Sequence, residues 1–249
     1  MTPDCAKRRL LLCAAAALGG WPLARAQDLP SLRIVSAHLP PLVVENGGKR
    51  PGALQEMVIE LCRRVRRTPT LEFLPWKRAI AVAQVSPRTA IFPLTRTPER
   101  EPQFRWLAPL FEENYVFLAR RGQRFDVQQP ERMKQQRITL IRGAAHITLL
   151  RELGYDTIVE ARSIDEVHRF LVHGVADAAF GEREIVRNSL RSRGQQDDFE
   201  ISEPVRKTAA WLAGSPDFSE AEAAVYQRAM QEMVADGTHG AILRRYGLA

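Results

Sequence analysis

The stretch TRTPEREPQF, residues 95–104, places two arginines, Arg96 and Arg100, in a short segment between two apolar runs. TAIFPL precedes the segment and RWLAPLF follows it, and both runs have the composition of strands. The two prolines of the segment exclude a long helix, because proline lacks the backbone N–H that a helix interior needs. A cation placed in such a turn, between two strands, needs an anionic partner or solvent.

The first 26 residues have the pattern of an export signal. A basic start, MTPDCAKRR, leads into an apolar stretch that is shorter than the roughly 20 residues of a membrane span. The stretch ends in ARA, residues 24–26, a small-x-small cleavage site. We therefore expect a signal peptide over 1–26 and a periplasmic protein. An uncleaved anchor and a lipoprotein signal at Cys13 are alternatives, and the Sec and twin-arginine routes stay open.

Charge and cysteine content narrow the class of protein. The formal net charge is +7, and residues 1–26 hold four basic and one acidic side chain, so the mature chain carries +7 − 3 = +4. This mildly basic balance requires no nucleic-acid partner, and we expect none. Only Cys62 remains after cleavage, so no internal disulfide is expected. Its apolar neighbours at helical spacing favour a buried structural thiol.

Strand-like and helix-like segments alternate in two similar sets. The first set has strands at 31–37, 69–76 and 89–95 and helices at 52–67 and 77–86. The second has strands at 114–121, 137–143, 156–161 and 176–182 and helices at 144–154 and 163–175. A strand at 207–214 and helices at 218–237 and 238–249 follow. Such βαβ order predicts an α/β fold of two lobes, with a ligand cleft at the carboxyl ends of the strands.

The order and spacing of these motifs resemble the periplasmic solute-binding proteins of polar amino-acid ABC transporters. These are the family 3 extracellular solute-binding proteins, with the type II Venus-flytrap fold. The resemblance runs over residues 30–247. It rests on LRIVSAHLPPLVVENGGKRPGALQEMVIEL, LEFLPWKRAIAVAQ, TRTPEREPQFRWLAPL, RITLIRGAAH, GVADAAFGE and MVADGTHGAILRRYG.

The resemblance implies a division of the mature chain into two lobes. Lobe 1 would comprise 28–110 plus 209–249, and lobe 2 would comprise 115–203. Two strands crossing near 110–114 and 204–208 would form the hinge, and the lobes would close over a ligand. A monomer that binds a small molecule and meets the membrane permease of an ABC transporter is implied as well.

The resemblance also gives Arg96 and Arg100 different roles. Arg100 would grip a ligand carboxylate, with Thr95 beside it, because the planar guanidinium matches a carboxylate bidentately. Glu182 would meet a ligand ammonium from lobe 2, where the family often has an aspartate one methylene shorter. Arg96 would point the other way along the extended segment, toward solvent.

Further ligand contacts are expected at the rim of the cleft. Arg142 lies before a helix start, where backbone N–H groups favour an anion. Trp76 would wall the pocket, a role that Phe92 shares with core packing. His38 follows the first strand, where the family often has an acidic residue. Because of this departure the ligand is expected only to be a small carboxylate-bearing solute, an amino acid or a related zwitterion.

Two alternatives to transport remain open. One is a periplasmic enzyme on the same fold, dehydratase-like, with Glu182 or His38 as acid or base. The other is a ligand-sensing partner of a membrane receptor. The sequence has no nucleophile–base pair, no HExxH or CxxC cluster and no phosphate loop, so no enzyme activity, metal or cofactor is expected.

We predict that the exported protein is cleaved after Ala26. The small residues on both sides of Arg25 fit the cleavage site, and its intact mass should begin at Gln27. A mass that retains residues 1–26 would contradict the prediction of a freely diffusing periplasmic protein.

Overall fold

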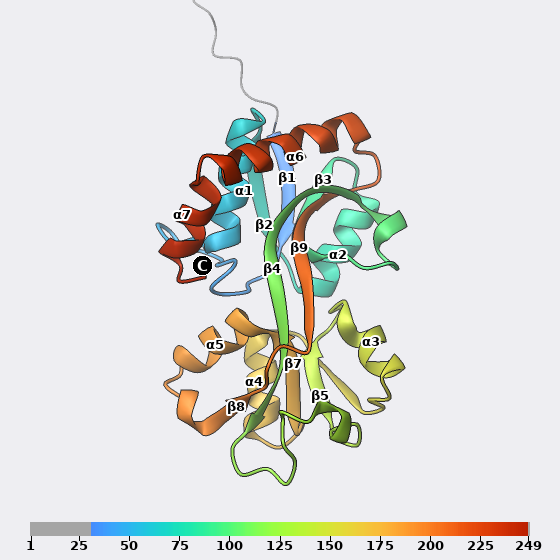
Figure 1. The fold of residues 1–249 in the computed structure, drawn as a ribbon. Coiled ribbons are helices and arrows are strands. Elements are labelled where there is room, and N and C mark those ends of the chain that lie inside the picture. The colour runs from blue at the N-terminus through green and yellow to red at the C-terminus, as the bar shows by residue number, and fades with distance from the viewer. Residues whose placement is uncertain (1–30, 249) are drawn as a thin grey trace, which may run out of the picture.

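A computed structural model describes residues 31–248. The export signal predicted over 1–26 lies outside the described residues. Within them, no helix is long and apolar enough to cross a membrane. The chain folds into two parts that are stacked along one long sheet (Figure 1).

Nine strands form one continuous sheet in the order β2-β1-β3-β9-β4-β7-β5-β6, with β8 pairing β4. β1 runs parallel to β2 and β3, and β5 runs parallel to β6 and β7, as βαβ order predicts. The strands are β1 (Ser31–Ser36), β2 (Thr68–Phe73), β3 (Thr89–Thr95), β4 (Arg105–Arg120), β5 (Ile138–Ile141), β6 (Ile158–Ala161), β7 (Ala178–Glu182), β8 (Phe199–Ile201) and β9 (Arg206–Gly214).

Two antiparallel strands, β4 and β9, connect the lobes (Figure 1). β4 is a single strand of 16 residues, whereas the sequence predicts a separate strand beginning at residue 114. Its pairing with β9 runs from Arg105↔Gly214 to Tyr115↔Arg206 and so passes through the predicted hinge. Neither strand breaks there, and the residue limits of the two lobes stay a prediction.

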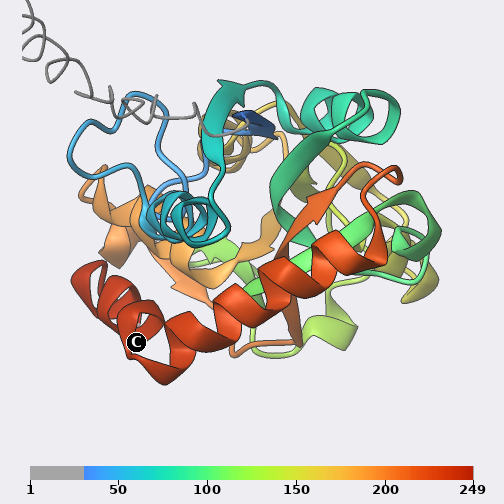
Figure 2. The same cartoon turned by 90° about the horizontal axis from the view of Figure 1, so that it is seen from above.

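Helices cover both faces of the sheet. They are α1 (Ala53–Arg64), α2 (Trp76–Val85), α3 (His146–Glu152), α4 (Ile164–Val172), α5 (Arg183–Arg191), α6 (Glu220–Ala235) and α7 (Thr238–Arg245). Figure 2 shows α6 crossing over lobe 1, although in the sequence it follows β9 and lies far from β1, β2 and β3. Helix α5 is the one that the sequence analysis misses, because its many polar residues hide a narrow buried stripe of Ile185, Val186 and Leu190.

Helices α4 and α6 both begin after a serine cap. Ser219 Oγ accepts a hydrogen bond from the backbone of Glu222, whose side chain returns one, which completes a capping box. Ser163 Oγ accepts from the backbone of Glu166. This second box is incomplete, because the Glu166 carboxylate accepts from the N–H of Arg162 instead.

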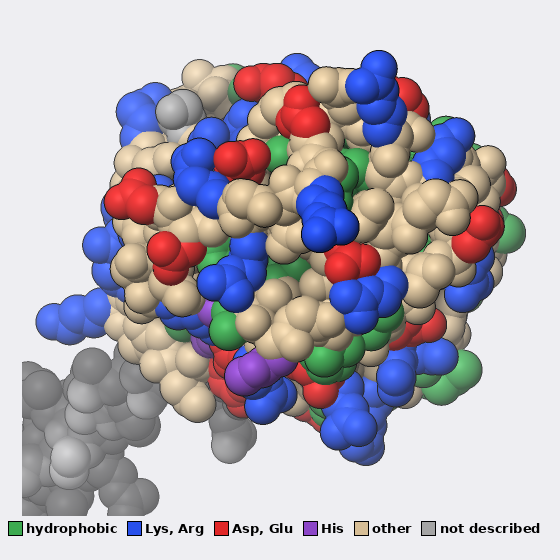
Figure 3. Space-filling model, turned by 90° about the horizontal axis from the view of Figure 1, so that it is seen from below, with side chains coloured by type: hydrophobic (Ala, Val, Ile, Leu, Met, Phe, Trp, Pro, Cys, Tyr) green, Lys and Arg blue, Asp and Glu red, His purple; other side chains and the backbone are tan. Residues whose placement is uncertain are grey.

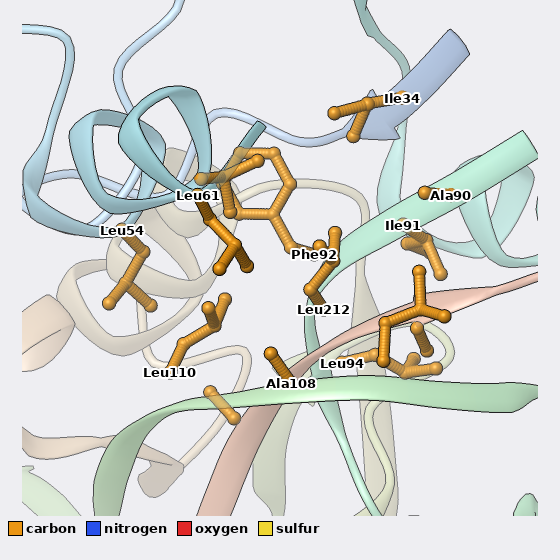
Figure 4. Close-up of a cluster of buried hydrophobic side chains, with 14 of the residues drawn as sticks. Ile34, Leu54, Leu61, Ala90, Ile91, Phe92, Leu94, Ala108, Leu110 and Leu212 are labelled. Carbon is orange, nitrogen blue, oxygen red and sulfur yellow. The ribbon is translucent and has the colours of Figure 1, made fainter. Parts of the chain in front are cut away.

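The core of lobe 1 packs between the sheet and α1 (Figure 4). Phe92 of β3 and Leu110 of β4 lie at its centre and are fully or almost fully buried. Cys62 lies in the same cluster, and burial raises the pKa of its thiol to about 12, so the predicted structural role is confirmed. Two smaller clusters flank the sheet of lobe 2. Seen from below, at the lobe 2 end, the surface shows basic side chains scattered among acidic ones (Figure 3).

We predict that Phe92→Ala lowers the free energy of unfolding by about 3–5 kcal/mol, because it leaves a cavity in a fully packed core. Urea unfolding followed by circular dichroism measures the loss. Val85→Ala is the control, since Val85 is 80% exposed and should change the stability by less than about 0.5 kcal/mol. Equal losses in the two variants would contradict the packing described here.

Candidate functional site

A cavity of ≈ 100 Å³ lies between the two lobes, where β3 and β7 end beside the middle of β4 and near the starts of α2, α3 and α5. Most of its lining is apolar, as is common for small-molecule sites. Four of the six predicted ligand contacts line it: Trp76, Thr95, Arg100 and Glu182. Its ionisable side chains are Arg100, Glu113, Tyr115, His146, His168 and Glu182.

The guanidinium of Arg100 connects the lobes. Nη1 donates to the backbone oxygen of Thr95 in lobe 1, at 3.0 Å, and Nη2 donates to that of Gly143 in lobe 2, at 2.9 Å. Burial lowers the pKa of Arg100, although its charge persists at neutral pH. Within residues 31–248 no carboxylate lies within 4.0 Å of this cation, so its strongest kind of partner is missing.

The hydroxyl of Thr95 contacts a buried polar group on β4, one of the two strands that connect the lobes. Its hydroxyl donates to Oε2 of Glu113 at 2.9 Å and lies 3.2 Å from the Tyr115 hydroxyl. The Tyr115 hydroxyl in turn donates to Oε1 of Glu113 at 3.3 Å. Glu113 is only 4% exposed, and burial raises the pKa of its carboxyl to about 8. The Glu113 carboxyl is therefore held by neutral donors alone.

Glu182 faces the cavity from lobe 2, at the junction of β7 and α5. Its Oε2 caps α5 by accepting from the backbone N–H groups of Glu184 and Ile185, at 2.8 and 3.0 Å. Its Oε1 is buried and has no hydrogen-bond partner within residues 31–248. Burial raises the pKa of this carboxyl to about 7, against the lowering effect of the backbone N–H groups of Ile185, Glu184 and Asn114. An unsatisfied buried acceptor of this kind favours a donor on a ligand.

An aromatic wall closes the lobe 2 side of the cavity. The ring of His146 stacks on Tyr115, with centroids 3.9 Å apart and an interplanar angle of 21°. Burial lowers the pKa of His146 to about 4, so the imidazole is neutral at physiological pH. Its Nδ1 is buried without a partner among the described residues. Trp76, at the start of α2, also lines the cavity, whereas Phe92 belongs to the core and not to the lining.

Two predicted contacts lie elsewhere. Arg142 is exposed and forms an ion pair with Glu160 at 3.5 Å, and it is not among the residues that line the cavity. His38 is exposed as well, and its Nδ1 accepts a hydrogen bond from the backbone N–H of Glu45 at 3.1 Å. The structure therefore does not bring these two side chains to the site.

Arg96 is exposed, as expected. Its guanidinium also pairs with Glu101 and lies over the rings of Trp106 and Trp211. These contacts hold it on the outer side of the segment, away from the cavity. Arg96 and Arg100 therefore have separate partners, and only Arg100 reaches the cavity.

Glu113, Tyr115 and His146 are the site residues that sequence reasoning missed. Glu113 follows Glu112, and two adjacent glutamates in a strand suggest that both side chains are solvated at the edge of a sheet. They do not suggest that one of the two is buried. Strand alternation is the signal that was available, since it must send one of two neighbours to the opposite face. His146 lies inside the helix predicted over 144–154, and nothing in the sequence around it indicates a site residue. Within residues 31–248 no group of His, Cys, Asp and Glu is arranged to hold a metal ion.

Comparisons with known proteins bear on the fold of the chain. No protein-family model and no curated protein sequence matches the chain. Solved structures do match. An arginine third transport system periplasmic binding protein from Legionella pneumophila has a TM-score of 0.76 at 18% identity, over 87% of this chain and 99% of that one.

Two further solved structures match the chain over most of its length. The ligand-binding core of GluR0 from Nostoc punctiforme, in complex with L-glutamate, has a TM-score of 0.76 at 17% identity, over 88% of this chain and 100% of that one. A histidine kinase sensor domain with similarity to periplasmic binding proteins has a TM-score of 0.79 at 16% identity, over 88% and 96%. The chain thus has the two-lobed type II periplasmic-binding-protein fold, which confirms the predicted fold class.

The lobes touch at Gly143, and we predict that Gly143→Ala separates them. Gly143 has a φ of +83°, and an added Cβ would lie 3.3 Å from backbone and side-chain atoms of Lys77 in lobe 1. The radius of gyration from small-angle scattering should increase, because the clash disfavours the closed arrangement of the lobes and an open arrangement gains population.

Gly122→Ala is the matched control for this test. Gly122 has a similar φ of +78°, but an added Cβ would have no atom within 4 Å. Both variants carry the backbone strain of a left-handed alanine, and only Gly143→Ala carries the clash between lobes. Equal radii for the two variants would contradict the close approach at Gly143.

Proposed function

We propose that this protein is a periplasmic solute-binding protein that captures a small carboxylate-bearing solute, an amino acid or a related zwitterion, and delivers it to an ABC transporter. The observation that carries the proposal is Arg100, a partly buried cation at the cavity whose guanidinium, within residues 31–248, hydrogen-bonds only to two backbone oxygens. A desolvated cation of this kind is strongly favoured by an anionic partner.

The cavity supplies groups for both ends of a zwitterion. Arg100 would receive the carboxylate, and the unsatisfied Oε1 of Glu182 would accept a hydrogen bond from the ammonium. Trp76 and the apolar lining would pack on the aliphatic part of the ligand. The lobes are in contact and the cavity is small, so entry requires the β4–β9 connection to bend open.

Sensing is the second candidate, and the likeness to a histidine kinase sensor domain favours it. A binding lobe pair can present its closed form to a receptor as well as to a permease. Capture of membrane partners with ligand-loaded protein distinguishes the two functions. Recovery of a permease would support transport, and recovery of a receptor would support sensing. Enzymatic turnover is tested by incubating the protein with each ligand and looking for product.

The first experiment is a thermal-shift screen of the mature protein against amino acids and small carboxylates. A ligand present at 100 times its dissociation constant should stabilise the protein by about 2.7 kcal/mol. The absence of any stabilising ligand in both classes would overturn the proposed function.

We predict that Arg100→Ala weakens binding of the ligand found in this screen by about 2–5 kcal/mol, which is roughly 30-fold to a few thousandfold. Arg100→Lys should recover only part of the loss, because lysine keeps the charge and loses the planar fork. Titration calorimetry measures all variants. Arg96→Ala is the control: Arg96 lies outside the cavity and should leave the affinity almost unchanged. Loss of binding in Arg96→Ala alone would contradict the assignment of Arg100.

A further inference from the structure

The cavity has one more acid than a zwitterion needs. Its charged side chains are Arg100, Glu113 and Glu182, which sum to +1 − 2 = −1 when all are ionised. The two carboxyl groups are 4% and 5% exposed, so solvent does little to offset this charge. An uncompensated buried charge is costly, and a site of this kind must take up either a proton or a cation.

Neither acid has a cationic partner within residues 31–248. Glu113 accepts hydrogen bonds from the hydroxyls of Thr95 and Tyr115, and Glu182 accepts them from backbone N–H groups. Arg100 acts on Glu113 only at longer range. Both carboxyls therefore have raised pKa values, caused first by burial, as expected for acids that lack a counter-ion.

The groups around Glu113 leave no second cation inside the cavity. Thr95 reaches it from β3, Arg100 from the turn after β3, Tyr115 from β4 itself, and Glu182 from the β7–α5 junction. His146 of α3 stacks on Tyr115 and is neutral at physiological pH. Arg206 of β9 affects His146, but its own side chain is exposed. A ligand is then the available source of positive charge.

We propose that the ligand is an amino acid whose side chain ends in a second cation, an amine or a guanidinium, and that Glu113 is the residue that selects it. This inference rests on the proposed function, which assigns the ligand carboxylate to Arg100 and the α-ammonium to Glu182. A ligand with a net charge of +1 brings the sum over cavity and ligand to zero. A neutral amino acid leaves the sum at −1, and one acid must then stay protonated.

Glu113 is suited to selection because it belongs to the hinge strand. It lies on β4 opposite Thr208 of β9, within the connection that must bend when the lobes close. A cation held there becomes enclosed on closure, and its attraction to the carboxylate strengthens as water leaves. Glu112, the preceding residue on β4, points outward, is 68% exposed and lies 3.8 Å from Lys207.

The test compares lysine with norleucine, which has nearly the same shape and no side-chain cation. In the unaltered mature protein, titration calorimetry at pH 8 should give an affinity for lysine about tenfold or more above that for norleucine. Ornithine and arginine serve as shorter and longer cations. In Glu113→Gln, the lysine preference should fall to about twofold or less.

Glu112→Gln is the matched control, with the same change of charge one residue along the strand. It should keep the full lysine preference, because its carboxylate faces solvent. Melting temperatures of both variants check that they fold. If Glu113→Gln does not fold, the comparison of lysine with norleucine and the proton count in the unaltered protein decide the outcome.

Proton release gives a readout that a purely structural role would not change. A ligand cation must displace the proton that Glu113 holds below a pH of about 8. Binding of lysine at pH 7 should therefore release protons, measured as a dependence of the binding enthalpy on the buffer. Because the ligand selects the ionised carboxyl, the affinity for lysine should rise about tenfold or more from pH 6 to pH 8, and more steeply than that for norleucine.

The outcomes are distinguishable. Equal affinities for lysine and norleucine would overturn this inference and leave the proposed function intact. A lysine preference that survives in Glu113→Gln would overturn the role of Glu113. If no amino acid of either kind binds, but another carboxylate does, the ligand class is wrong. If no carboxylate binds at all, the proposed function and this inference fail together.

Discussion

A guanidinium that leaves bulk water must find acceptors, and Arg100 finds them on both lobes. Its two hydrogen bonds to the backbone oxygens of Thr95 and Gly143 hold the sides of the cavity together. The cation also acts at longer range on the buried Glu113 and Tyr115 of β4. β3 and the turn after it fix its position, and the close approach of Gly143 to α2 supplies the acceptor from lobe 2. The same bonds are the ones that a ligand carboxylate would replace.

The continuous sheet explains how two lobes can share one site. β4 and β9 pass from lobe 1 to lobe 2 without a break, and Glu113 and Tyr115 lie on the stretch between them. Motion of the lobes therefore changes the surroundings of these side chains directly. Side chains on a hinge strand are moved by closure directly, without another residue in between. Trp76 and His146, by contrast, each move with one lobe.

Much of the fold could be predicted from the sequence, since periodicity and caps are local properties. Ser219 and its helix show this, because a cap and an apolar stripe lie within one short segment. Arg100 and Thr95 were found through their motif. Glu113 was missed because its burial depends on β9 and β7, which lie far away in the chain. Helix α5 was missed because most of its residues are polar, and only tertiary packing shows which side is covered.

The buried thiol of Cys62 has a practical consequence for optical measurements. It is 0% exposed and its thiolate is suppressed at neutral pH, so thiol-reactive dyes should leave it unlabelled in the folded protein. A cysteine introduced at the rim of the cavity would then carry the fluorophore alone. The folded protein could therefore be labelled at this one introduced cysteine. A change of fluorophore emission would then report the movement of one lobe against the other.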